Sequence, residues 1–231
     1  MSLLSILLLQ IDTTLKGVAN ATTTPAEKIS LFNLLKEGGV LMIPLLLCSL
    51  LLVYVFVERL LAIRKAAVLD PNFMSRMRDY ITDGNLPAAK SLSKNTNSPI
   101  ARMLDKGLNR IGKPIDNIER SMENTGKLEV YKMEKNLSIL STLAGIAPMF
   151  GFLGTIAGMI ILFFNVQHQG FSLETIAGGI YTKMVTSAVG LIIGLLSYVA
   201  YTYLNAQINK NVNKMEEATV EFLDILQEPA K

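Results

Sequence analysis

Three long runs of apolar residues divide the chain, at residues 40–57, 137–164 and 184–204. Each is long enough to cross a bilayer, since roughly 20 apolar residues in an α-helix span about 30 Å of hydrocarbon. None of the three runs contains an Asp or a Glu. The pattern predicts an all-α membrane protein with three transmembrane helices, of which the second and third extend far into the cytoplasm and form a helical bundle there.

Between and after these runs, apolar residues recur at helical spacing. Residues 115–164 contain few helix breakers, which predicts one long helix that rises from the bundle through the membrane. In the tail, apolar residues return every three or four positions, so the third span is expected to continue as a helix that packs against the extension of the second. The residues of this face are Ile208, Val212, Met215, Thr219, Phe222 and Leu226.

Short local signals mark helix ends and bends elsewhere. Asp70-Pro71 and Ser98-Pro99 are each typical of a helix start, in which a capping side chain precedes a proline at the first helical position. Pro44 lies within the first turns of the first span, where a kink is expected.

The distribution of charge predicts how the chain is oriented. Residues 59–135 contain 15 Lys and Arg against 9 Asp and Glu, whereas residues 165–175 contain no Lys or Arg. Cytoplasmic loops retain basic residues. The expected order is an extracytoplasmic segment 1–38, a first span 39–58 running inward, a cytoplasmic helical domain 59–136, a second span 137–164 running outward, an outer loop 165–175, a third span 176–204 running inward and a cytoplasmic tail 205–231.

The first eleven residues are also mostly apolar, but the run is too short to span a membrane. It lacks the basic start of a secretory signal peptide. We therefore expect a retained outer segment that lies in the membrane interface.

Residues that carry chemistry are scarce. The chain has one cysteine, Cys48, and one histidine, His168. Cys48 lies in the first span, where a small apolar packing residue is expected, and His168 is expected in a solvated loop. No metal site, cofactor site or catalytic motif is recognisable, so an enzyme is not expected.

Small and hydroxyl-bearing residues form a stripe on each of the last two spans. The second span carries Ser141, Gly145, Pro148, Gly151, Thr155 and Gly158, and the third carries Lys183, Thr186, Ser187, Gly190, Gly194, Ser197 and Tyr201, with Thr182 beside it. Gly154 with Gly158, and Gly190 with Gly194, have the GxxxG spacing of closely packed membrane helices. The stripes predict helix packing at the glycines. For the hydroxyls, packing and a polar ion path remain alternatives.

Lys183 is the one charged residue within the third span. A charged side chain at membrane depth is costly and usually functional. Two interpretations stay open. Its long side chain either reaches the outer interface or pairs with Glu174, or it contributes a charge to a channel surface.

Two segments then resemble a known family. Residues 147–159 read APMFGFLGTIAGM, and residues 176–191 read IAGGIYTKMVTSAVGL. They resemble the second-helix and third-helix signatures of the MotA/TolQ/ExbB proton channel family. The resemblance extends from about Gly38 to the C-terminus. The size and three spans are more similar to ExbB and TolQ members than to MotA members, which have four spans.

The resemblance implies a motor in the bacterial inner membrane. Five copies are expected to form a ring, whose pore holds transmembrane helices of an ExbD- or TolR-like partner that supplies an Asp. Proton flow is expected to drive work on a TonB- or TolA-like protein. Thr155 matches a pore threonine, and Ser187 stands where ExbB-like members carry another.

Thr182 departs from the family pattern, because many members carry a glutamate there. The ring is therefore expected to offer hydroxyls, from Thr155, Thr182, Thr186 and Ser187, and no acid. Hydroxyl oxygens also coordinate Na⁺, so the coupling ion stays open. The expected output is nutrient import across the outer membrane through a TonB-like protein. A TolQ-like envelope system, a gliding or secretion motor, and a non-conducting scaffold remain alternatives.

Overall fold

The structure, a computed structural model, describes residues 40, 42–170 and 172–227. Every regular element in this part of the chain is an α-helix, which confirms the all-α prediction. In chain order the helices are α3 Met42–Ala67, α4 Phe73–Thr82, α5 Leu86–Asn95, α6 Pro99–Leu108, α7 Ile115–Glu134, α8 Leu137–Gln169 and α9 Leu173–Gln227. The predicted outer segment 1–38, with its apolar start, lies outside the described residues.

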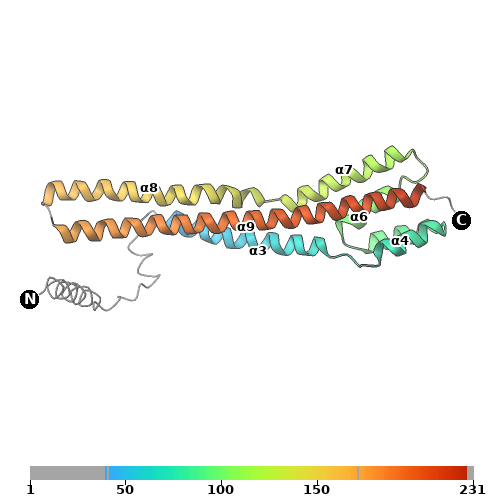
Figure 1. Cartoon of the computed structure of the whole chain (residues 1–231), viewed down its shortest axis with the longest axis horizontal. Helices are drawn as coiled ribbons and strands as arrows, with labels where there is room; N and C mark the ends of the chain where they lie inside the picture. Colours follow the sequence, from blue (N-terminus) through green and yellow to red (C-terminus); the bar gives the residue numbers. More distant parts are fainter. Residues whose placement is uncertain (1–39, 41, 171, 228–231) are drawn as a thin grey trace, which may run out of the picture. The chain divides into compact units, whose positions relative to one another are not determined.

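Among the described residues, three helical stretches are long and apolar enough to cross a membrane, namely Met42–Ala67 (α3), Ile115–His168 (α7 with most of α8) and Ile176–Gln227 (most of α9). The antiparallel helices α8 and α9 lie side by side, and α3 packs against both (Figure 1). A small cluster of buried residues joins the three helices, and Cys48 belongs to it, as expected for a packing residue. Its members are Met42, Leu45, Cys48, Leu143, Ala147 and Ile193.

Beyond the apolar part, the second half of α9 runs along the other helices of a helical bundle (Figure 1). Helices α4, α6 and α7 contact α9, and α5 packs against α4 and α6. Ile208, Met215 and Phe222 are buried in the bundle core. The predicted tail face is therefore confirmed at these three residues, whereas Val212, Thr219 and Leu226 are only half-buried. Its packing against α7, which leads into the second span, is confirmed. Helix α9 runs without a break for 55 residues.

The predicted single helix over residues 115–164 is wrong, because it is broken at Lys135 and Asn136. Asn136 has φ 62°, in the left-handed region that Asn tolerates better than most residues. No proline or glycine causes this break. Its cause must be sought in contacts with other parts of the fold.

Those contacts come from the end of the first span. The buried Arg59 donates from Nη1 to the carbonyl oxygen of Lys132, at 3.3 Å. In an uninterrupted helix this carbonyl would accept from the N–H of Asn136. Asn136 instead donates its side-chain amide to Glu58 Oε2, at 3.5 Å. The two neighbours, Glu58 and Arg59, thus satisfy groups on both sides of the break.

Two smaller expectations also change. Pro44 is the third residue of α3, so it lies in the first turn, where backbone N–H groups have no partner within the helix and no kink is expected from a proline. The helix expected to start at Asp70-Pro71 begins instead at Phe73. Asp70 accepts from the backbone N–H of Asn72, at 3.0 Å, and so stabilises the turn that precedes it.

Candidate functional site

The line of contact between α8 and α9, which we call the α8–α9 seam, is built on glycines. A Cβ atom on Gly190 would lie 2.7 Å from the carbonyl oxygen of Ala147 and 2.9 Å from Cα of Gly151. A Cβ on Gly151 would lie 3.1 Å from the carbonyl oxygen of Ser187. The backbones of the two helices therefore touch, and there is no room for a side chain at either glycine.

Pro148 extends this close approach towards the bundle. Proline lacks the N–H that would bond the carbonyl four residues earlier, here that of Ala144. A Cβ on Gly194 would lie 2.5 Å from Cγ of Pro148 and 3.0 Å from the carbonyl oxygen of Ala144. The missing side chain of Gly194 thus lets α9 cover the point at which the α8 backbone has lost a hydrogen bond. Gly154 is also buried.

Lys183 fills the space left by another glycine of the seam. A Cβ on Gly158 would lie 2.1 Å from Cδ and 2.4 Å from Cγ of Lys183. The aliphatic stem of the lysine therefore lies directly over Gly158, and Lys183 is half-buried. The predicted pairing with Glu174 stays a prediction, because that side chain lies outside the described residues.

The predicted hydroxyl residues lie within a short length of the seam, but not in one kind of environment. Gly151 lies against Ser187, and Thr155 is one turn further along α8. Thr155, Thr182 and Ser187 are half-buried at the margin of the seam. Thr186 is only 1% exposed and lies inside it. The side chains of Thr155, Thr182 and Ser187 are thus partly accessible at the surface of the helix pair, whereas that of Thr186 is not.

The threonine hydroxyls donate their protons to their own helices. Thr155 Oγ1 donates to the carbonyl oxygen of Phe152 at 2.6 Å, and Thr182 Oγ1 donates to that of Gly178 at 2.9 Å. Thr186 Oγ1 donates to the carbonyl oxygen of Thr182 at 3.4 Å. Only lone pairs then face outward. Such oxygens suit a hydronium ion, a metal cation or the O–H of a protonated acid.

Thr155 also borders a shallow hollow of about 510 Å³ on the outward face of α8. The rest of its lining is apolar and consists of Ile156, Met159, Ile160 and Phe163. Ile160 is 65% exposed and Phe163 is 58% exposed. The sequence did not single out these four residues, because apolar side chains are ordinary anywhere on a membrane-spanning helix. These four side chains and Thr155 form an apolar surface with a single hydroxyl group, and another apolar helix can cover it.

The bundle contains a buried carboxylate that the sequence patterns did not reveal. Glu129 accepts from Arg102 Nη2 at 2.6 Å and from Lys132 Nζ at 2.7 Å, and its side chain is 5% exposed. Burial raises the pKa of Glu129, but the hydrogen bonds and charges of Arg102 and Lys132 outweigh burial, so the net pKa lies below the ordinary value for Glu. The pairing with Lys132 could be predicted from its spacing of three residues on one helix, whereas the contact with Arg102, 27 positions earlier, could not.

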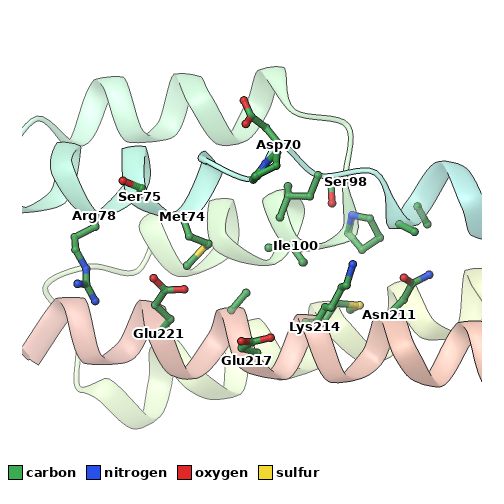
Figure 2. A pocket seen from close by; sticks show the side chains of 17 residues that line it. Asp70, Met74, Ser75, Arg78, Ser98, Ile100, Asn211, Lys214, Glu217 and Glu221 are labelled. Atoms are coloured by element: carbon green, nitrogen blue, oxygen red, sulfur yellow. The ribbon is translucent and has the colours of Figure 1, made fainter.

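A larger hollow of about 610 Å³ lies in the bundle, between the end of α3, α4, the start of α6 and α9 (Figure 2). Arg78 from α4 and Glu221 from α9 both border it, together with Lys214. Ser98 Oγ is buried there without a hydrogen-bond partner among the described residues. The mixed charges favour neither an anion nor a cation, and the hollow belongs to the bundle rather than to the membrane-spanning part.

Comparison with known proteins adds an independent observation. Residues 95–217 match the model of a family described as the MotA/TolQ/ExbB proton channel family. This match covers more than half of the chain and includes α6, α7, α8 and most of α9.

Individual relatives agree with the family match. A putative biopolymer transport protein, an ExbB homolog of Methanothermobacter thermautotrophicus, is 23% identical over 194 residues, which cover 81% of this chain and 67% of the relative. A putative ExbB-like protein of Synechocystis is 26% identical over 73% of this chain and 68% of its own length. The Tol-Pal system protein TolQ of Haemophilus influenzae is 26% identical over 48% of this chain and 49% of its own length.

Proposed function

Because the chain belongs to the MotA/TolQ/ExbB proton channel family, we propose that it is the ring-forming ion channel subunit of a motor that converts the proton motive force into mechanical work. Its class as a proton channel subunit with multiple membrane spans follows from the family and the three apolar helices. The ring, the motor action and the process that it drives are proposals. The observation that carries them is the group of half-buried hydroxyls beside the α8–α9 seam, in second and third spans without any carboxylate.

We place the protein in the bacterial inner membrane, with the N-terminus outside and the bundle in the cytoplasm. The excess of Lys and Arg in residues 59–135 over residues 165–175 supports this orientation. The large exposed apolar side chains of α8 and α9, such as Ile160 and Leu195, support contacts with lipid or with neighbouring copies. A homopentamer would provide contacts with neighbouring copies and with lipid, since five copies would enclose a pore and still face lipid outside.

In this assembly Thr155, Thr182 and Ser187 face the pore, and Thr186 packs within the subunit. An ExbD- or TolR-like partner occupies the pore with a transmembrane Asp, which carries the proton. The threonine lone pairs accept a hydrogen bond from the protonated acid or hold the arriving cation, because their own protons are bound within the helices. Oxygen ligands of this kind also suit Na⁺, so a sodium-driven form stands beside the proton-driven one.

For the process that is driven, we propose work on a TonB-like protein and nutrient import across the outer membrane. The relatives named as ExbB proteins support this output, and the TolQ relatives support envelope maintenance as the second candidate. Mass spectrometry of the chains that co-purify from native membranes distinguishes the two, because each output needs a different energy-receiving protein.

The test of the channel is proton flux through the complex, purified from native membranes and reconstituted in liposomes. Thr155→Val should lower the flux at least about tenfold, since one lost hydrogen bond to the ion path raises a barrier by about 1.4 kcal/mol. Thr202→Val is the matched control, because Thr202 also donates to its own helix, to Tyr198 at 3.0 Å, but lies outside the hydroxyl group. Equal flux in both variants would reject Thr155 as a pore residue, and a wild-type complex without flux would favour the scaffold.

A further inference from the structure

We propose that Lys183, seated on Gly158, is the binding site for a carboxylate on a membrane-embedded helix of a partner chain. The inference rests on the proposed function and assigns two different binding roles within it. Lys183 receives the charged form of the partner's acid, whereas the threonine hydroxyls receive its protonated form. No motif of the sequence assigns this role to a lysine, and Lys183 directly follows the position at which the expected glutamate is replaced by Thr182.

The position of Lys183 within the fold is the first support. It lies ten residues from the start of α9 at Leu173, an axial rise of about 15 Å. Its stem is held against α8 in the slot that Gly158 leaves empty. The side chain is therefore placed by packing, and the ammonium group is kept close to the seam.

The second support is the absence of any compensating acid in the spans. Residues 40–57, 137–164 and 176–204 contain no Asp or Glu, and Lys183 is their only charged residue. Glu174, whose side chain lies outside the described residues, precedes Lys183 by nine positions on the same helix, an axial rise of about 13 Å. An ammonium group at membrane depth is expensive unless it is paired, and a carboxylate on another chain would provide that pairing.

The third support is the hydrogen-bonding state of the neighbouring hydroxyls. Thr182 and Thr186 both donate to carbonyl oxygens of α9, so they cannot donate to a carboxylate as well. The ammonium group of Lys183 has three donors and a full charge. Hydrogen bonds to a charged group are roughly twice as strong as neutral ones. A carboxylate in this region is therefore attracted to Lys183 before any of the threonines.

A functional cycle follows from these preferences. The ionised acid rests on Lys183, whose charge favours the ionised form. When a proton binds to the carboxylate, the ion pair loses its attraction and the new O–H can donate to a threonine oxygen. When the proton leaves, the carboxylate returns to Lys183. Each proton would thus move the partner's acid between two adjacent positions.

The test uses the complex purified from native membranes, with the variants Lys183→Met and Lys183→Arg. The first readout is the amount of partner chain retained per subunit at pH 8. Lys183→Met should lower the affinity for the partner about three- to fifteen-fold, the range of one polar contact between membrane helices. Lys183→Arg keeps the charge and should retain the partner. Lys210→Met, at an exposed lysine of α9 beyond the spans, is the control.

The second readout is the pH dependence of proton flux in liposomes. Without the cation, the acid holds its proton to higher pH, so the midpoint should rise by about 1–3 pH units in Lys183→Met. Gly158→Ala should move the midpoint in the same direction by a smaller amount, because its methyl group displaces the lysine stem. Gly145→Ala, whose methyl group meets open space in the subunit, is its control.

The outcomes separate this inference from the proposed function. Full partner retention and an unchanged midpoint in Lys183→Met would overturn the inference, and would indicate a lysine that only extends to the membrane surface. If Lys183→Met does not assemble, Gly158→Ala decides, and a midpoint equal to that of Gly145→Ala would overturn the inference. If the wild-type complex carries no flux, the proposed function fails, while partner retention still tests the lysine.

Discussion

The helical bundle and the α8–α9 seam are held together by opposite kinds of residue. The bundle core contains fully buried, large side chains, among them Phe73, Met77 and Phe222. The seam contains Gly151 and Gly190, where backbone meets backbone. Water drives apolar side chains into the bundle. Lipid tails provide no such drive between membrane helices, so close contact between small residues has to replace it.

The bundle also contains buried glycines, and their surroundings sharpen the contrast. A Cβ on Gly126 would lie 3.2 Å from Cε of Met103, the flexible end of a side chain. A Cβ on Gly190 would lie 2.9 Å from the backbone of Gly151. A methionine can change its rotamer, whereas a helix backbone can yield only if the whole helix moves. Two buried glycines therefore have different tolerance for the same substitution.

The largest effect is expected in the bundle core. Phe222→Ala should lower the free energy of unfolding by about 3–5 kcal/mol, because it removes a fully buried ring from a packed core. Pulse proteolysis of the purified protein measures this loss. Val220→Ala, on the same helix but at a 60% exposed position, is the control and should change stability by less than about 0.5 kcal/mol. Equal losses would mean that the bundle core is not the stabilising unit.

The seam should show a smaller but more specific effect. Gly190→Ala is expected to cost about 1–3 kcal/mol, since its methyl group forces α8 and α9 apart. In Gly126→Ala the strain is offset by the roughly 1 kcal/mol that alanine gains over glycine in a helix, so stability should be nearly unchanged. Unfolding in mixed detergent micelles compares the two variants. The contrast between the regions fails if Gly126→Ala is the more damaging.

The smallest effect concerns the buried carboxylate of the bundle. Arg102 and Lys132 are 42% and 65% exposed, so water screens their pairing with Glu129, and Glu129→Gln should cost only about 1 kcal/mol at neutral pH. The cost should depend on pH. Because the folded-state pKa of Glu129 is lowered, its stabilisation is present above the ordinary Glu pKa of about 4.3 and is lost as the pH falls through the lower folded-state value.

Unfolding curves of the wild type and Glu129→Gln between pH 3 and 8 check this prediction. The two proteins should differ most near neutral pH and converge in acid. Glu123→Gln is a suitable control, since the Glu123 side chain is 57% exposed and pairs with the exposed Lys127. A difference that persists unchanged at pH 3 would mean that Glu129 acts through its shape rather than its charge.

Much of the fold could be predicted because its signals are local. A run of apolar residues predicts a span wherever it occurs, and the three- and four-residue spacing from Ile208 to Phe222 predicts one buried helix face. The family signatures in residues 147–159 and 176–191 are likewise contiguous. They direct attention to Thr155, Thr182 and Ser187 without any knowledge of how α8 and α9 meet.

The break at Asn136 could not be predicted in this way. The residues that stabilise it, Glu58 and Arg59, are more than 70 positions away in the sequence. Glu129 depends similarly on Arg102, which lies 27 positions earlier. Nothing in the local sequence distinguishes these residues from ordinary charges on a solvated helix.

The amino-acid sequence alone determined that this protein has three apolar helices, that the last one continues into a bundle, and that the second and third spans carry hydroxyls and a single lysine but no acid. These properties depend on residue type and short-range spacing, which no partner can alter. Only the tertiary structure decided that Lys183 lies over Gly158, that Thr186 is enclosed and that the long helix breaks at Asn136. Each of these depends on which atoms of a distant segment come within contact distance, and that is set by how the helices pack.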